Sequence, residues 1–196
     1  MEGTEAPDEL LFETVVAHYR EPHRQYHSLV HLDHVLAEAE ELLLVVPVDD
    51  PGAVRLALFF HDVVYDPRAV DNEARSAALA RRHLADLGLP APRVDAVARL
   101  VEATAHHETP PADLDLAVVN DADLAVLAGV PSAYDAYVAG VRAEYGHVDD
   151  AAWRAGRRAV LRALLDRPAI FATDPMRVRE PRARANLSAE LSLLSR

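Results

Sequence analysis

The 196-residue chain contains no cysteine and no lysine, and these absences exclude several kinds of chemistry. Without cysteine, neither a disulfide bond nor a thiolate nucleophile is available. Without lysine, Schiff-base catalysis and phosphate binding by a P-loop are excluded, because both need a lysine amine. All 20 basic residues are therefore arginines. Together with the abundant alanine, this points to a genomic base-composition bias.

Long apolar runs are also lacking. No uncharged apolar stretch of about 18 residues occurs, so we expect no membrane span. The first five residues are acidic rather than basic and apolar, which argues against a signal peptide. The net charge of −12 argues against nonspecific binding of nucleic acid, which relies on a cationic surface. We therefore expect a cytoplasmic protein whose partners are neither membranes nor nucleic acids.

Apolar residues recur at helical spacing almost throughout, and turn signals separate the helical stretches. No stretch shows sustained strand alternation, and only Leu114–Val119 is ambiguous. The pattern predicts an all-α protein with a single domain over residues 1–196. The expected helices cover about 8–19, 28 to beyond 39, 51 to beyond 62, 72–87, 92–107, 114–127, 131–145, 149–166 and 180–194.

The pair His61-Asp62 stands in one of the most apolar segments of the chain. Burying a polar group without a partner costs roughly 2–7 kcal/mol, and burying an isolated charge costs far more. A metal ion would compensate both groups, because it accepts a neutral imidazole and a carboxylate. The alternative is a buried His–Asp pair that is hydrogen-bonded to other helices.

Further potential metal ligands lie on other predicted helices. Ligands from separate helices can converge on one point in the core of a bundle. The order His, His-Asp, His, Asp along the chain therefore favours a metal site. The additional candidates are His27, His31, His34, His106, His107, Asp121 and Asp123.

The order of His31, His61-Asp62 and Asp123 resembles that of the HD superfamily of metal-dependent phosphohydrolases. More narrowly, the chain is similar to a bacterial family of predicted HD phosphohydrolases over nearly its whole length from Tyr26. The resemblance implies a single HD-type helical bundle that holds a divalent ion, Mn, Mg, Fe or Zn, on His31, His61, Asp62 and Asp123. The matching stretches are Tyr26–His31, Phe60–Asp66, Asp71–Glu73 with Ser76–Ala77, Asp121–Leu124, Arg142 with Glu144–Tyr145, Gly156–Arg157, and Glu180 with Ala183–Arg184 and Asn186–Leu187.

The resemblance also implies choices between neighbouring residues. Asp123 is preferred to Asp121, because the superfamily ligand follows a small residue and precedes the apolar continuation of its helix. Asp121 is then expected on the helix surface or as a partner of the metal ligands. His31 is preferred to His27, for which we expect a contact with substrate or with a ligand.

Three residues are the candidates for catalysis. Asp66, or Glu73 through a water molecule, would accept a proton. Glu73 is equally explained as an acidic residue at a helix start. His107, preferred to His106, would contact phosphate or a second metal ion; the alternative is that both imidazoles are exposed at a frayed helix end.

Three arginines would either clamp phosphate or form salt bridges between helices: Arg142, Arg157 and Arg184.

These expectations describe a metal-dependent phosphohydrolase of the phosphomonoesterase or phosphodiesterase class. It would use metal-activated water on a small phosphorylated metabolite, most naturally a nucleotide. One alternative is an alarmone (guanosine tetraphosphate) pyrophosphohydrolase, but Tyr65 replaces the first residue of the acidic pair in those enzymes and only Asp66 remains. The other is a metal-stabilised nucleotide-binding module without turnover. The sequence leaves open whether the protein is a homo-oligomer.

Overall fold

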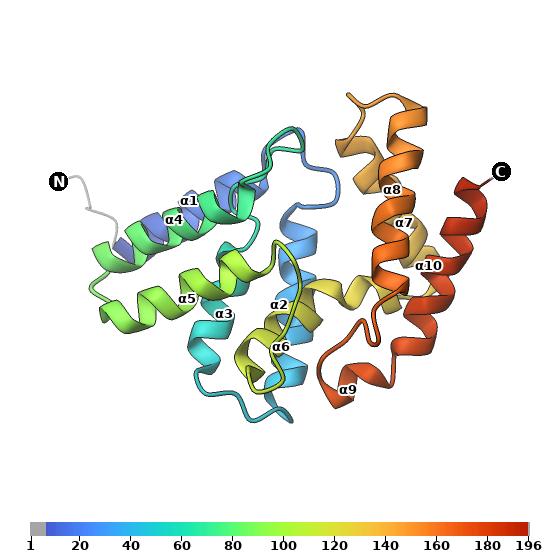
Figure 1. The fold of residues 1–196 in the computed structure, drawn as a ribbon. Helices are drawn as coiled ribbons and strands as arrows, with labels where there is room; N and C mark the ends of the chain where they lie inside the picture. Colours follow the sequence, from blue (N-terminus) through green and yellow to red (C-terminus); the bar gives the residue numbers. More distant parts are fainter. Residues whose placement is uncertain (1–6, 196) are drawn as a thin grey trace.

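In the computed structural model, which describes residues 7–195, every regular element is a helix (Figure 1). The prediction of an all-α protein is therefore confirmed. The described elements are α1 (Pro7–Tyr19), α2 (Leu29–Leu43), α3 (Pro51–Phe60), α4 (Asn72–Asp86), α5 (Ala91–Ala103), α6 (Leu114–Asp123), a 3-10 helix η1 (Leu124–Ala128), α7 (Pro131–Glu144), α8 (Asp150–Leu165), α9 (Asp174–Arg177) and α10 (Glu180–Leu194).

Several helix ends have a clear local cause. The Asp50 side chain accepts hydrogen bonds from the amides of Gly52 and Ala53, so it caps α3, and Pro51 occupies the first helical position. Gly88 follows α4 with a φ of 77°, the left-handed conformation that glycine adopts readily. Ser28 holds the capping position of α2, although its side chain makes no capping hydrogen bond.

Other boundaries differ from the sequence pattern. The pattern predicts a helix through His107, but α5 ends at Ala103. The backbone then turns sharply, and His107 has a φ of 48° that no α-helix contains. The single helix predicted over 114–127 is divided into α6 and η1, and the one-turn helix α9 was not predicted.

One continuous apolar core extends from Leu11 in α1 to Leu187 in α10, and the described chain forms a single helical domain. Helices α2, α3 and α6 pack against one another at its centre, α4 packs on α5, and α10 packs on α8 and η1. Figure 1 shows α1, α4 and α5 on one side of α2, and α7, α8 and α10 on the other. The central trio carries the residues predicted to bind metal.

Among residues 7–195, no single helix has the length and apolar composition needed to cross a bilayer. One pair of segments, Leu114–Ala128 with Pro131–Glu144, meets these criteria only when taken together, and it is bent by 105°.

Candidate metal centre

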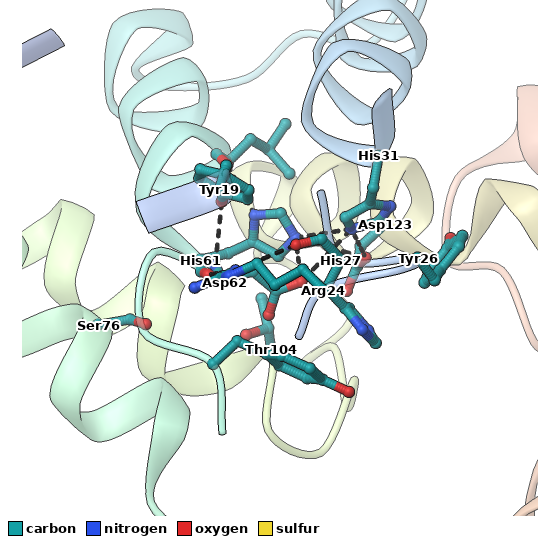
Figure 2. Close-up of polar contacts among 12 residues, drawn as sticks. Tyr19, Arg24, Tyr26, His27, His31, His61, Asp62, Ser76, Thr104 and Asp123 are labelled. Carbon is teal, nitrogen blue, oxygen red and sulfur yellow. Dashed lines mark hydrogen bonds and ion pairs between the residues drawn. The ribbon is translucent and has the colours of Figure 1, made fainter. Parts of the chain in front are cut away.

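The ends of the three central helices bring together the four residues predicted to bind metal (Figure 2). His31 lies in the first turn of α2, His61 and Asp62 directly follow α3, and Asp123 is the last residue of α6. Both imidazoles are buried. The two carboxylates are partly exposed, and they line a cleft of about 420 Å³. The centre therefore has its imidazoles inside the protein and its carboxylates facing a space that a ligand can enter.

The potential ligand atoms lie close to one another. The Nε2 atoms of His31 and His61 are 3.1 Å apart. Oδ1 of Asp123 lies 3.3 Å from His31 Nε2 and 3.6 Å from His61 Nε2. Oδ2 of Asp62 lies 3.5 Å and 3.3 Å from the same two nitrogens. His31, His61 and Asp123 form a group whose ligand atoms all lie within 4.8 Å of one another.

These separations suit a shared cation. Ligand atoms held at about 2.1 Å from one ion lie roughly 3.0 Å apart at right angles and about 3.4 Å apart at the tetrahedral angle. The tautomer of His61 agrees with such a site. Its Nδ1 lies 2.7 Å from the carbonyl oxygen of Leu58, so Nδ1 carries the proton that it donates, and Nε2 presents a lone pair to the centre. The donor set therefore fits a divalent metal ion.

The electrostatics of the centre also favour a positive charge there. Burial alone would lower the pKa of His61, but Asp62 and Asp123 beside it raise this pKa well above the ordinary value. Burial would raise the pKa of Asp123, yet hydrogen bonds from His107 and the two buried imidazoles hold it well below its usual range. A metal ion or protons on the imidazoles can provide the positive charge that these carboxylates require.

The structure separates the roles of Asp121 and Asp123. Asp121 is buried, and its carboxylate accepts hydrogen bonds from the amides of Ala172 and Thr173 and from the Thr173 hydroxyl. It lies neither on the helix surface nor beside the metal ligands, contrary to both expectations for it. The reason is that the segment before α9 covers this face of α6 and uses the Asp121 carboxylate as its hydrogen-bond acceptor.

His107 lies beside the centre and contacts one of its carboxylates. Its Nε2 is 2.7 Å from Oδ2 of Asp123, and both His106 and His107 line the cleft. The left-handed backbone of His107 is unusual for a residue other than glycine, and such strain persists only where surrounding contacts enforce it. Arg167 supplies those contacts by donating to the carbonyl oxygens of His106 and His107. This turn therefore presents His107 to Asp123.

His27 is held in the cleft by a carboxylate from a distant helix. Its Nδ1 lies 2.7 Å from Oε2 of Glu144, in α7, and its ring stacks on Tyr65 at 4.1 Å. Glu144 also accepts from the Tyr65 hydroxyl and from the amides of Gln25, Tyr26 and His27. Because five donors surround this buried carboxylate, the pKa of Glu144 is lowered to about 2 despite its burial. Because Nδ1 is bonded to Glu144, Nε2 is the ring nitrogen of His27 that remains for a ligand in the cleft.

The other two catalytic candidates, Glu73 and Asp66, line two different cavities. Glu73, in the first turn of α4, lines the cleft that contains Asp62 and Asp123. Asp66 lines a separate cavity of about 730 Å³. One Asp66 carboxylate oxygen accepts from the amide of Arg68 within its own loop. The structure thus places Glu73, but not Asp66, in the lining of the cleft at the metal centre.

The three candidate arginines are all hydrogen-bonded within the chain. Arg142 donates to the carbonyls of Tyr145 and Val148 and to Asp150. Arg157 is buried and forms a salt bridge with Glu190 of another helix, as the alternative predicted. Arg184 forms a salt bridge with Glu180, which belongs to the same helix. None of the three lines the cleft at the metal centre.

Two supporting residues were not singled out from the sequence as part of the site. Glu144 holds His27 from 117 positions away. Arg24 is buried and donates to the carbonyls of Asp62 and Val63, so it joins the loop before α2 to the turn after α3. The sequence signal for Arg24 is weak, because a lone arginine in a polar loop normally indicates a solvated residue.

Comparisons of the chain with protein-family models, with curated proteins and with solved structures gave no match. The interpretation of the centre therefore depends on its own chemistry and geometry.

Proposed function

We propose that this protein is a metal-dependent phosphohydrolase of the HD type, and that its substrates are small phosphate esters, nucleotides in particular. The observation that carries the proposal is the grouping of His31, His61, Asp62 and Asp123 beside a cleft. The two Nε2 atoms lie 3.1 Å apart, and each lies 3.3–3.6 Å from an oxygen of either carboxylate. Two neutral imidazoles and two carboxylates balance the charge of a divalent ion, and they leave coordination positions on the cleft side.

His31, His61, Asp62 and Asp123 are the residues that would hold the ion. When bound, a divalent ion supplies polarisation of a phosphoryl oxygen and a lowered pKa for a water molecule. His107 would then orient the Asp123 carboxylate through their hydrogen bond, as partners of metal ligands commonly do.

His27 is the residue best placed to carry a proton. The bond from Nδ1 to Glu144 fixes the ring, and the stacked Tyr65 restricts its rotation. With Nδ1 occupied, Nε2 is the atom that would donate a proton to a leaving oxygen in the cleft. Glu73, on the α4 side of the same cleft, would position a water molecule.

The proposal is tested by metal content and turnover. Protein stripped of metal and reloaded with Mn, Mg, Fe or Zn is assayed with a nitrophenyl phosphate monoester, the corresponding diester, a nucleotide panel and guanosine tetraphosphate. We expect metal-dependent release of phosphate, with nucleotides preferred. Release of pyrophosphate from guanosine tetraphosphate would favour the alarmone hydrolase, and nucleotide binding without release in any metal would favour a non-catalytic module.

Two variants make this test specific to the centre. His61→Ala removes one ligand, so we expect loss of bound metal by elemental analysis and loss of turnover. His34→Ala is the matched control, because His34 is an exposed histidine on the same helix as His31. A His61→Ala protein that folds and retains both metal and activity would overturn the proposal.

A further inference from the structure

An apolar groove lies next to the cleft, and the metal centre does not use it. The groove has a volume of about 320 Å³ and is formed by the end of α7, the loop after it and one face of α8. Its lining is almost entirely apolar or aromatic: Val141, Tyr145, Val148, Ala152, Trp153, Gly156, Arg157 and Val160. Val160 is half exposed, so apolar surface is open to a ligand here.

The groove adjoins the cleft. Val141 and Tyr145 line both spaces, and they form the wall that the two share. A molecule whose phosphate lies beside Asp62 and Asp123 would reach the groove by passing Tyr145, which lines both spaces. This adjacency favours another part of the same small molecule as the occupant of the groove.

The walls of the groove are held in place by contacts outside it. The Arg142 guanidinium lies 5.3 Å from the centre of the Trp153 ring and donates to the carbonyl of Tyr145, so it contacts both aromatic residues. Arg157 is paired with Glu190 in α10, which leaves its charge compensated. A rigid aromatic surface of this kind binds flat apolar groups by stacking.

Gly156 is one of the residues that line the groove. A Cβ atom placed on Gly156 would meet no heavy atom within 4 Å, although Gly156 lies in the middle of a helix. A side chain at this position would therefore meet no neighbour at its Cβ atom, and it would add bulk to the lining of the groove.

We propose that this groove binds the planar aromatic part of the substrate, a nucleobase or an aryl group, while the phosphate occupies the cleft. This inference rests on the proposed phosphohydrolase function and specifies its substrate class: phosphate esters of aromatic or heteroaromatic alcohols and nucleosides, rather than simple sugar phosphates.

The experiment compares adenosine 5′-monophosphate with ribose 5-phosphate, which share the same leaving oxygen and differ by the base. We expect kcat/KM to be about tenfold higher for the nucleotide, because its base can stack on the aromatic lining of the groove and ribose 5-phosphate has no such group. Gly156→Leu should reduce this ratio toward one. Ala155→Leu, which adds the same side chain at an exposed position outside the groove, is the control and should preserve the ratio.

Binding gives a second readout that does not depend on turnover. Trp153 is the only tryptophan of the chain, so its fluorescence reports directly on the groove. Adenosine 5′-monophosphate should change the emission saturably, ribose 5-phosphate should not, and Gly156→Leu should abolish the response.

The outcomes separate the two proposals. Equal kcat/KM for both esters, together with an unresponsive Trp153, would overturn the groove assignment and leave the phosphohydrolase intact. Hydrolysis of neither ester, nor of the nitrophenyl esters and the nucleotide panel, in any metal would overturn the phosphohydrolase, and the fluorescence response would then decide the groove alone. Emission that depends on protein concentration without ligand would assign the groove to a second copy of the chain and overturn the inference.

Discussion

Asp121 and Asp123 are only two residues apart, yet their carboxylates serve different parts of the molecule. Two positions in a helix differ by about 200°, so the side chains leave α6 on nearly opposite faces. Asp123 meets the imidazoles, and Asp121 meets the segment before α9. The choice of Asp123 over Asp121 agrees with this geometry, whereas the surroundings of Asp121 could not be foreseen because they depend on a segment 51 to 52 residues away.

This difference predicts opposite effects of two matched substitutions. Asp123→Asn should reduce the bound metal measured by elemental analysis, because an amide is a weaker ligand than a carboxylate. Asp121→Asn should leave the metal content unchanged and lower the free energy of unfolding by about 1–3 kcal/mol, because a buried acceptor of three hydrogen bonds is weakened. Loss of metal in Asp121→Asn alone would contradict these assignments.

Glu144 predicts a pH-dependent contribution to stability. Its pKa falls from 4.5 to about 2 in the folded protein, so the ionised form stabilises the fold. This contribution is complete above pH 4.5 and is lost as the pH falls toward about 2. At neutral pH, Glu144→Gln should lower the free energy of unfolding by about 3 kcal/mol.

The measurement is urea unfolding of both proteins at several pH values. The difference between Glu144→Gln and the natural protein should shrink below pH 4.5, because the natural carboxyl group itself becomes protonated there. A constant difference across this range would show that the charge of Glu144 contributes nothing. His27 and Tyr65, which face Glu144 directly, are unchanged in both proteins.

At the scale of the helices, the four candidate metal ligands lie at or next to helix ends. Each ligand occupies a first turn, a last turn or the residues just beyond, so a small displacement of one helix moves its ligand. The capping of α3 is therefore relevant to His61, which immediately follows that helix. Because the cap is local in sequence, Asp50-Pro51 could be identified without the structure.

We predict that Asp50→Ala lowers the free energy of unfolding by about 1 kcal/mol, the usual contribution of a capping carboxylate. The ion pair between Asp50 and Arg93 is half exposed and adds little. Thermal unfolding measures the loss. Asp49→Ala, which removes the exposed neighbouring carboxylate, is the control and should be close to neutral.

The helices also show how far local sequence determines the fold. The limits of α10 match the prediction of 180–194, because proline and apolar spacing mark them locally. The end of α5 does not match, because Arg167 holds the turn at His106 and His107 from a distant part of the chain. The same reasoning applies to the site: its ligands follow an order along the chain, whereas Glu144 and Arg167 support it through contacts between remote segments.

At the scale of the whole molecule, one buried ion pair joins the helices on the far side of α2. Arg157 in α8 forms two hydrogen bonds with Glu190 in α10, and the Tyr134 hydroxyl of α7 donates to the same carboxylate. Burial would lower the pKa of Arg157, but Glu190 and Tyr137 raise it above the ordinary value. Three helices therefore share one satisfied polar cluster.

Removing one partner from this cluster should be strongly destabilising. Glu190→Leu leaves the Arg157 charge buried and unpaired, so we expect a loss of about 3–5 kcal/mol in the free energy of unfolding. The double variant Arg157→Met/Glu190→Leu removes both charges and should recover most of this loss. A double variant as unstable as Glu190→Leu would indicate that packing, rather than the unpaired charge, is responsible.

Glu144 has a consequence for the order in which the protein is made. All four predicted ligands belong to the first 123 residues, whereas the carboxylate that fixes the loop ahead of α2 is residue 144. During translation the nascent chain therefore exposes a histidine- and aspartate-rich segment before its anchor leaves the ribosome. We therefore expect the proposed metal site to reach its full cation affinity only after α7 has emerged and docked.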